Sequence, residues 1–138
     1  MNRINLKAVA IGILLTLALD TVLGIGLLLL HGGDVSVEGR SAEQVSQDLQ
    51  AVTTSTSFLL TSIILGTLTT VAGGCVAARI AGRFPYFNGL GVGILGALFG
   101  LLFWGENPLW FNLLALVTVI PMALLGAHIA VRLRSVQP

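Results

Sequence analysis

Four long apolar stretches constrain what this chain can fold into more than any other feature of its sequence. They cover residues 6–30, 56–78, 87–104 and 109–131. A helix that crosses a bilayer needs about 20 consecutive, mostly apolar residues, and inside lipid its backbone polar groups must be bonded within the helix. Only 9% of the residues are charged, compared with about 25% in an average soluble domain. The sequence therefore predicts an all-α membrane protein, a single four-transmembrane-helix bundle over residues 1–138.

The segment between the first two spans, residues 31–54, is hydrophilic and long enough to carry structure of its own. Ser41 and Gln44 have the spacing of a capping box, in which two side chains bond the free backbone N–H groups that begin a helix. The residues that follow place three apolar side chains on one helical face, at Val45, Leu49 and Val52. This pattern predicts a short amphipathic helix at residues 42–52, lying on the membrane surface or over the mouth of the bundle.

The basic residues predict the orientation of the chain. Six of the seven lysine and arginine residues fall on one side of the membrane once four spans are drawn: Arg3, Lys7, Arg79, Arg83, Arg132 and Arg134. Basic residues in short loops stay on the cytoplasmic side, and Arg40 alone lies opposite, in the acidic segment 31–54. We therefore expect an N-in/C-in protein of the bacterial inner membrane. The net charge of +1 gives no indication of a nucleic-acid partner.

Small residues recur along the spans at the spacing of helix-packing seams. Helices cannot associate in lipid by apolar burial alone, so small residues that let backbones approach mark the contacts. In the last three spans the steps average 3.5 residues, which is typical of left-handed packing. The predicted packing positions are Gly66 and Gly73, then Gly89, Gly93, Gly96 and Gly100, and finally Ala123 and Gly126. In the first span Gly12, Thr16, Asp20 and Gly24 recur every four residues, and this stripe should face protein.

Asp20 is the one ionisable residue well inside a predicted span. Placing a carboxylate there costs about 2.5–3.5 kcal/mol on insertion scales, so such residues are candidates for a functional role. Two interpretations stay open. The carboxyl is protonated and bonded by a hydroxyl at comparable depth, from Thr61, Ser62 or Thr67, or it exchanges protons and cations.

Several basic side chains gather at the predicted cytoplasmic rim. They are Arg79, Arg83, His128, Arg132 and Arg134. Such a rim can bind anionic lipid head groups at about 1 kcal/mol per charge. The alternative is that it serves only to fix the orientation of the chain.

The stretch Gly73-Gly74-Cys75-Val76-Ala77-Ala78-Arg79-Ile80-Ala81, followed by Asn88-Gly89 and a glycine-rich span, resembles small uncharacterised four-span bacterial membrane proteins. The resemblance covers the second and third spans, and its motif consists mostly of small residues. It implies the four-span topology and no activity.

Three functions follow from these features. Because the sequence has no nucleotide loop, zinc-ligand spacing or nucleophile with a nearby base, we expect neither an enzyme nor a cofactor. The first hypothesis is a non-catalytic accessory or assembly subunit, whose glycine-lined faces pack in a homo-oligomer or a larger membrane complex.

The second hypothesis is a small dimeric, proton-coupled exporter that uses Asp20. In size and span number the chain is similar to small multidrug-resistance exporters, which also place one acidic residue in the first span. It departs from them in its long acidic segment 31–54 and its few aromatic residues within the first two spans. The third hypothesis, a lipid-acting membrane enzyme, is favoured only by the basic rim and His128.

Overall fold

The computed structural model describes residues 3–33, 35, 38–105 and 107–135, and this part of the chain is all helical. Its five helices are α1 (Leu6–His31), α2 (Ala42–Thr53), α3 (Thr56–Ala81), α4 (Pro85–Leu102) and α5 (Leu109–Ser135). The helices α1, α3, α4 and α5 are long and apolar enough to cross a membrane. The predicted all-helical fold with four potential spans is confirmed at this level.

The ends of the long helices differ from the predicted spans by a few residues. The helix α3 continues to Ala81 rather than residue 78, and α5 continues to Ser135 rather than residue 131. The helix α4 begins at Pro85, where the missing N–H of proline leaves no helix bond unmade. The helices extend past the predicted spans because hydropathy marks only where the apolar run ends. The polar residues beyond that point can still continue the helix.

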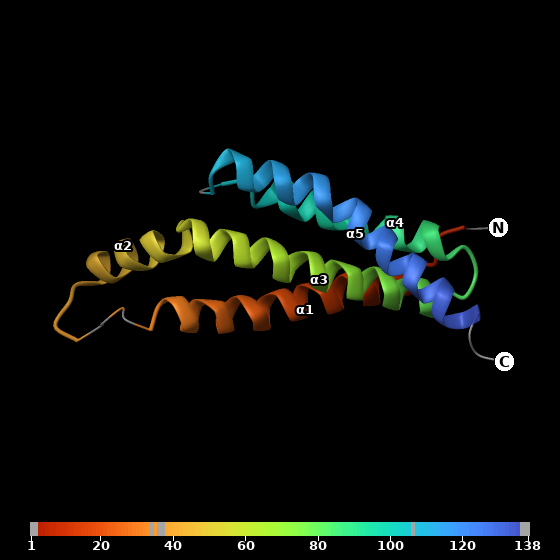
Figure 1. Cartoon of the computed structure of the whole chain (residues 1–138), viewed down its shortest axis with the longest axis horizontal. Helices are drawn as coiled ribbons and strands as arrows, with labels where there is room; N and C mark the ends of the chain where they lie inside the picture. Colours follow the sequence, from red (N-terminus) through yellow and green to blue (C-terminus); the bar gives the residue numbers. More distant parts are fainter. Residues whose placement is uncertain (1–2, 34, 36–37, 106, 136–138) are drawn as a thin grey trace.

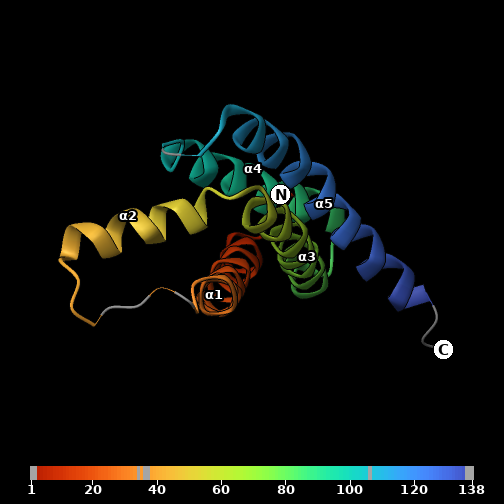
Figure 2. The same ribbon diagram turned by 60° about the vertical axis from the view of Figure 1, so that its left-hand side comes forward.

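The short helix α2 begins with a capping box. Gln44 N donates to Ser41 Oγ at 3.3 Å, and Ser41 N donates to Gln44 Oε1 at 3.1 Å. An ion pair between Arg40 and Asp48 ties the preceding turn to this helix. None of the α2 residues is buried, and the helix projects beyond the end of the α1–α3 pair (Figures 1 and 2).

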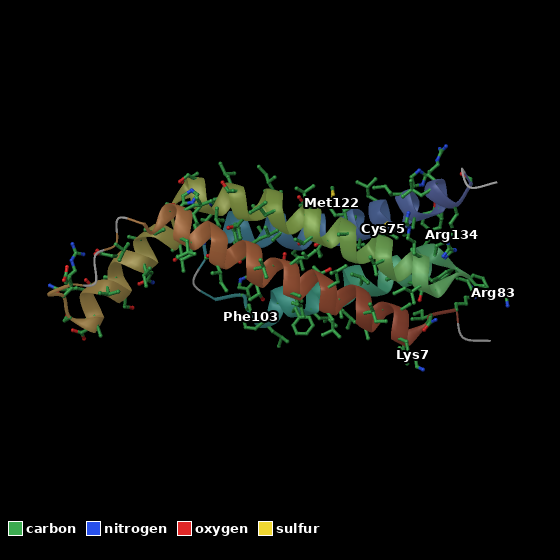
Figure 3. All side chains as sticks on the ribbon, turned by 90° about the horizontal axis from the view of Figure 1, so that it is seen from below. Lys7, Cys75, Arg83, Phe103, Met122 and Arg134 are labelled. Carbon is green, nitrogen blue, oxygen red and sulfur yellow. The ribbon has the colours of Figure 1, made fainter. Side chains whose placement is uncertain are left out.

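The helix α3 lies at the centre of the bundle and contacts α1, α4 and α5, whereas α1 and α5 do not meet in the described part of the chain. The start of α1 and the end of α5 lie at the same end of the molecule (Figure 1). We call this the basic end, because Lys7, Arg83 and Arg134 gather there (Figure 3), and the opposite end the α2 end. Toward the α2 end, the α4–α5 hairpin diverges from α1 and α3 (Figure 1).

The two clusters of buried residues lie in the half of the bundle nearer the basic end and are rich in small residues. One buried cluster joins α1, α3 and α4 through Val9, Ile13, Ala77 and Val92. A second joins α3 and α5 through Ala78, Ala127 and Ala130. The backbones of α3 and α5 approach so closely that a methyl group added to Gly74 would overlap the carbonyl of Ala123. Packing of this kind is how helices associate in lipid.

Asn88 connects three parts of the chain at the basic end. Its side chain is fully buried, at 0% exposure. Asn5 N donates to Asn88 Oδ1 at 2.7 Å, while Asn88 Nδ2 donates to the carbonyl oxygens of Phe84 at 2.9 Å and Arg83 at 3.4 Å. The start of α1 is thereby fixed to the turn between α3 and α4.

Candidate functional site

The small, polar stripe of α1 faces α3, as the sequence predicts for Gly12, Thr16 and Asp20. A Cβ added to Gly12 would lie 2.7 Å from the carbonyl oxygen of Gly73. One turn further, Thr16 Oγ1 lies 3.0 Å from the carbonyl oxygen of its own helix at Gly12 and 3.4 Å from that of Thr69. Asp20 follows on the same face, and its Oδ1 accepts a hydrogen bond from Thr69 Oγ1 at 2.5 Å.

The hydroxyl that reaches Asp20 belongs to Thr69, which corrects the partners expected from the sequence. Thr61 and Thr67 donate to carbonyl oxygens of their own helix, at 2.9 and 2.7 Å, and Ser62 lines a nearby cavity. Depth alone suggested these three residues. The face of α3 that packs on α1 carries Thr69 instead, because the two helices cross with Thr16 opposite this turn.

Asp20 lines a cavity of about 430 Å³ between α1, α3, α4 and α5, in the half of the bundle toward the α2 end. We call this cavity the Asp20 crevice. Its walls are mostly apolar, with a few polar groups among them. The polar lining residues besides Asp20 include Ser62, Thr67, Thr70, Asn107, Asn112 and Thr118. A volume of this size and a lining of this kind are typical of pockets that bind small molecules.

Aromatic side chains from three helical segments line the crevice nearest the α2 end. They are Phe58 at the start of α3, Phe103 and Trp104 after α4, and Phe111 in the first turn of α5. Phe103 is 78% exposed and therefore lies at the edge of the lining. The first two spans contain few aromatic residues. Most aromatic side chains that line the crevice come from the turn between α4 and α5 and its flanking residues. Trp104 and Phe111 flank that turn in the sequence, and their convergence depends on how the hairpin folds.

The predicted packing seams extend through only part of the bundle. A Cβ added to Gly93 would lie 3.0 Å from Ile120 Cα, and one added to Gly96 would lie 2.9 Å from Val119 Cγ2. Similar close contacts surround Gly73, Gly89 and Gly126, and the buried Ala123 lies against Gly89 and Gly93. By contrast, a Cβ at Gly24, Gly66 or Gly100 would meet no atom within 4 Å. These three glycines line the crevice instead.

Asp20 is the one ionisable side chain among the described residues that line the crevice. No lysine or arginine is present there to pair with it, and its hydrogen-bond donor in the structure is a neutral hydroxyl. An unpaired carboxylate is costly in such surroundings. The crevice therefore favours either a protonated Asp20 or an ionised Asp20 that is neutralised by a cation.

The predicted basic rim is assembled at the basic end, but its members differ in what they contact. Arg134 donates to the carbonyl oxygens of Gly82 at 2.8 Å and of Arg79, so it caps the end of α3. His128 Nδ1 lies 3.0 Å from Tyr86 Oη, and Arg132 Nε donates to His128 Nε2 at 3.4 Å. Arg79 and Arg83 have exposed side chains. The rim thus has a structural role at Arg134 and accessible donors elsewhere.

Comparison of the chain with protein-family models, curated proteins and solved structures found no match. The described residues contain no group of three or more histidine, cysteine, aspartate or glutamate side chains placed to hold a metal ion. The Asp20 crevice is the feature of the described residues that best indicates a function.

Proposed function

We propose that this chain is a membrane protein that binds a lipophilic organic cation in the Asp20 crevice and exchanges it for a proton. The observation that carries the proposal is the Asp20 carboxyl group, which has no basic partner among the described residues, in a cavity of about 430 Å³ that aromatic side chains line. This feature supports the exporter hypothesis over the accessory subunit.

The chemistry of the lining fits such a ligand. Aromatic faces attract organic cations through the ring quadrupole, by about 0.5–2 kcal/mol per contact. When a monovalent cation binds, the Asp20 carboxyl releases its proton, and the carboxylate neutralises the positive charge. The site then has no net charge with either the proton or the cation bound. Neutrality in both states matters because a net charge within a membrane is costly.

The finer topology is part of the same proposal. Both termini face the cytoplasm of a bacterial inner membrane, and the Asp20 crevice opens toward the outer side. The gathering of Lys7, Arg83 and Arg134 at one end supports this orientation. The glycine spacing of α3, α4 and α5 supports left-handed packing. Anionic lipid head groups bind the exposed donors of the rim, of which Arg79, Arg83 and Arg132 are the main ones.

The test is ion binding to purified protein in detergent. Tetraphenylphosphonium and tetraphenylborate are lipophilic ions of nearly the same size and opposite charge. We expect the cation to bind and release about one proton, and the anion to bind much more weakly. Asp20→Asn should remove the proton release, because an amide cannot ionise. No proton release by the wild-type protein, or equal binding of both ions, would contradict the proposal.

Two glycines of α1 provide a matched control for the location of the site. A Cβ added to Gly24 or to Gly26 meets no atom within 4 Å, but only Gly24 lines the crevice. Gly24→Leu should therefore weaken cation binding by filling the cavity, while Gly26→Leu should bind like the wild-type protein. Equal effects of the two variants would place the ligand elsewhere.

The second candidate function is an accessory or assembly subunit, in which a helix of a larger membrane complex or of a second copy occupies the crevice. The observation in its favour is that a Cβ added to Gly24, Gly66 or Gly100, from three different helices, would meet no atom within 4 Å, although glycines of this kind mark helix contacts in membranes. Purification in mild detergent tests it. A stoichiometric partner that Gly24→Leu releases and Asp20→Asn retains would favour this candidate over the exporter.

A further inference from the structure

The hydroxyl of Thr69 lies between two oxygen atoms that both lie within hydrogen-bond distance. Its Oγ1 is 2.5 Å from Asp20 Oδ1 and 2.9 Å from the carbonyl oxygen of Gly66. A hydroxyl has one hydrogen to donate and two lone pairs that accept. Thr69 therefore donates to one of these oxygens at a time. Which oxygen accepts depends on whether Asp20 carries a proton.

We infer that Thr69 is a positioning residue, which holds the Asp20 carboxyl in one place whether or not it carries a proton. The inference rests on the proposed exchange of a cation for a proton. When Asp20 is ionised, Thr69 donates to its carboxylate. When Asp20 is protonated, its O–H donates to Thr69 Oγ1, and the Thr69 hydroxyl turns to donate to the Gly66 carbonyl. The same two oxygen–oxygen contacts serve both arrangements.

The Gly66 carbonyl oxygen keeps a side-chain donor in both arrangements. Thr70 Oγ1 also donates to it, at 2.7 Å. When Thr69 turns toward the ionised Asp20, this second hydrogen bond remains. Because Gly66 lies inside α3, its carbonyl oxygen also accepts the backbone N–H four residues on, so it is not left without a donor when Thr69 turns. The exchange of a proton thus requires the rotation of one hydroxyl and no movement of a helix.

Thr69 itself is held firmly by its surroundings. Its side chain is 3% exposed, so water has little access to replace its hydroxyl. Thr16 packs against the same turn of α3, with its Oγ1 3.4 Å from the Thr69 carbonyl oxygen. The described crevice lining from α1, α3, α4 and α5 holds no ionisable group besides Asp20. The hydroxyl of Thr69 is therefore the direct partner through which the protein acts on this proton.

The first test observes the carboxyl itself and needs no ligand. The C=O stretch of a protonated carboxyl group shifts in the infrared spectrum when its hydrogen bonds change, and the Asp20 band is identified by its loss in Asp20→Asn. Valine has nearly the volume of threonine but lacks the hydroxyl. We expect Thr69→Val to move the Asp20 band to higher wavenumber and Thr69→Ser to leave it in place. An unchanged band in Thr69→Val would overturn the inference.

The second test is the affinity for tetraphenylphosphonium. Thr69→Val should weaken binding roughly tenfold or more, because the ionised carboxylate loses a hydrogen bond to a charged group. Thr69→Ser should bind within about threefold of the wild-type protein, since it keeps the donor. Thermal unfolding of both variants separates this effect from a loss of stability.

The two proposals fail in different ways. If Asp20→Asn abolishes cation binding while Thr69→Val binds like the wild-type protein, the role of Thr69 is wrong and the proposed function stands. If the wild-type protein binds no cation, the proposed function fails, and the infrared spectra still decide whether Thr69 positions the carboxyl.

Discussion

Two buried polar residues, Asn88 and Thr69, bond to groups that lie far away in the sequence. Asp20 can be recognised in the sequence because a charge stands out within an apolar run. Its partner Thr69 falls on the packing seam of the second span, between Gly66 and Gly73, but α3 carries several other hydroxyl side chains. Which of them faces α1 depends on the relative height and rotation of two helices, and neither is encoded locally. Asn88 lacks a signal for the same reason, because its partner Asn5 lies 83 residues away, at the start of α1.

Asn88 should be a stabilising residue, and a second asparagine provides the comparison. Asn88→Ala removes three hydrogen bonds and the packing of a fully buried side chain, so we expect a loss of about 2–4 kcal/mol in the free energy of unfolding. Asn112 makes one hydrogen bond in the structure, at 3.1 Å to the carbonyl of Asn107, and Asn112→Ala should cost below about 1 kcal/mol. Thermal unfolding in detergent measures both, and a comparable loss in the two variants would contradict this role of Asn88.

At the scale of the helix, regular spacing of small residues predicts which face packs but not how far along the helix it does so. The α4 positions Gly89, Gly93 and Gly96 approach α5 closely. A Cβ added to Gly100, the next position of the same seam, would meet no atom within 4 Å. The steps between the four residues, of four, three and four, continue the same seam to Gly100. Gly100 lies in the lining of the Asp20 crevice, so the close packing of the seam ends where the crevice begins.

Substitutions in the packed part of this seam should lower stability, and substitutions beyond it should have little effect. Gly93→Leu and Gly96→Leu introduce side chains into close contacts with α5, so each should lower stability by about 1–3 kcal/mol. Gly100→Leu has open space around it, and Leu102→Ile changes a side chain that is 78% exposed. Both should be nearly silent in thermal unfolding. Equal, small effects from all four variants would show that the seam is not packed.

At the scale of the whole molecule, hydropathy predicts the number of long helices and their approximate ends, because these depend on residues that are close in sequence. The amphipathic helix expected at residues 42–52 appears as α2, at Ala42–Thr53, since a capping box is also a local signal. The Asp20 crevice is different. It requires the angle between the α1–α3 pair and the α4–α5 hairpin, which the sequence pattern does not specify.

The orientation of the whole chain can be tested by labelling. In a Cys75→Ser background, a cysteine at Ser46 in α2 should react with an impermeant maleimide added to intact cells. A cysteine at Ser135, at the end of α5, should not react until the membrane is opened. The expectation follows from the basic residues that gather at the end of the bundle where α5 ends. The reverse labelling pattern would overturn the N-in/C-in topology.

The contact between Gly74 and Ala123 holds α5 against α3. From there toward Leu109, α5 borders the Asp20 crevice. From Ala123 back to Leu109 the helix extends about 21 Å, at about 1.5 Å per residue. Over that length a tilt of about 10° displaces the far tip by about 4 Å, although the backbone beside the contact moves hardly at all. A tilt of the hairpin about this contact would therefore change the width of the Asp20 crevice while the glycine-packed half kept its contacts.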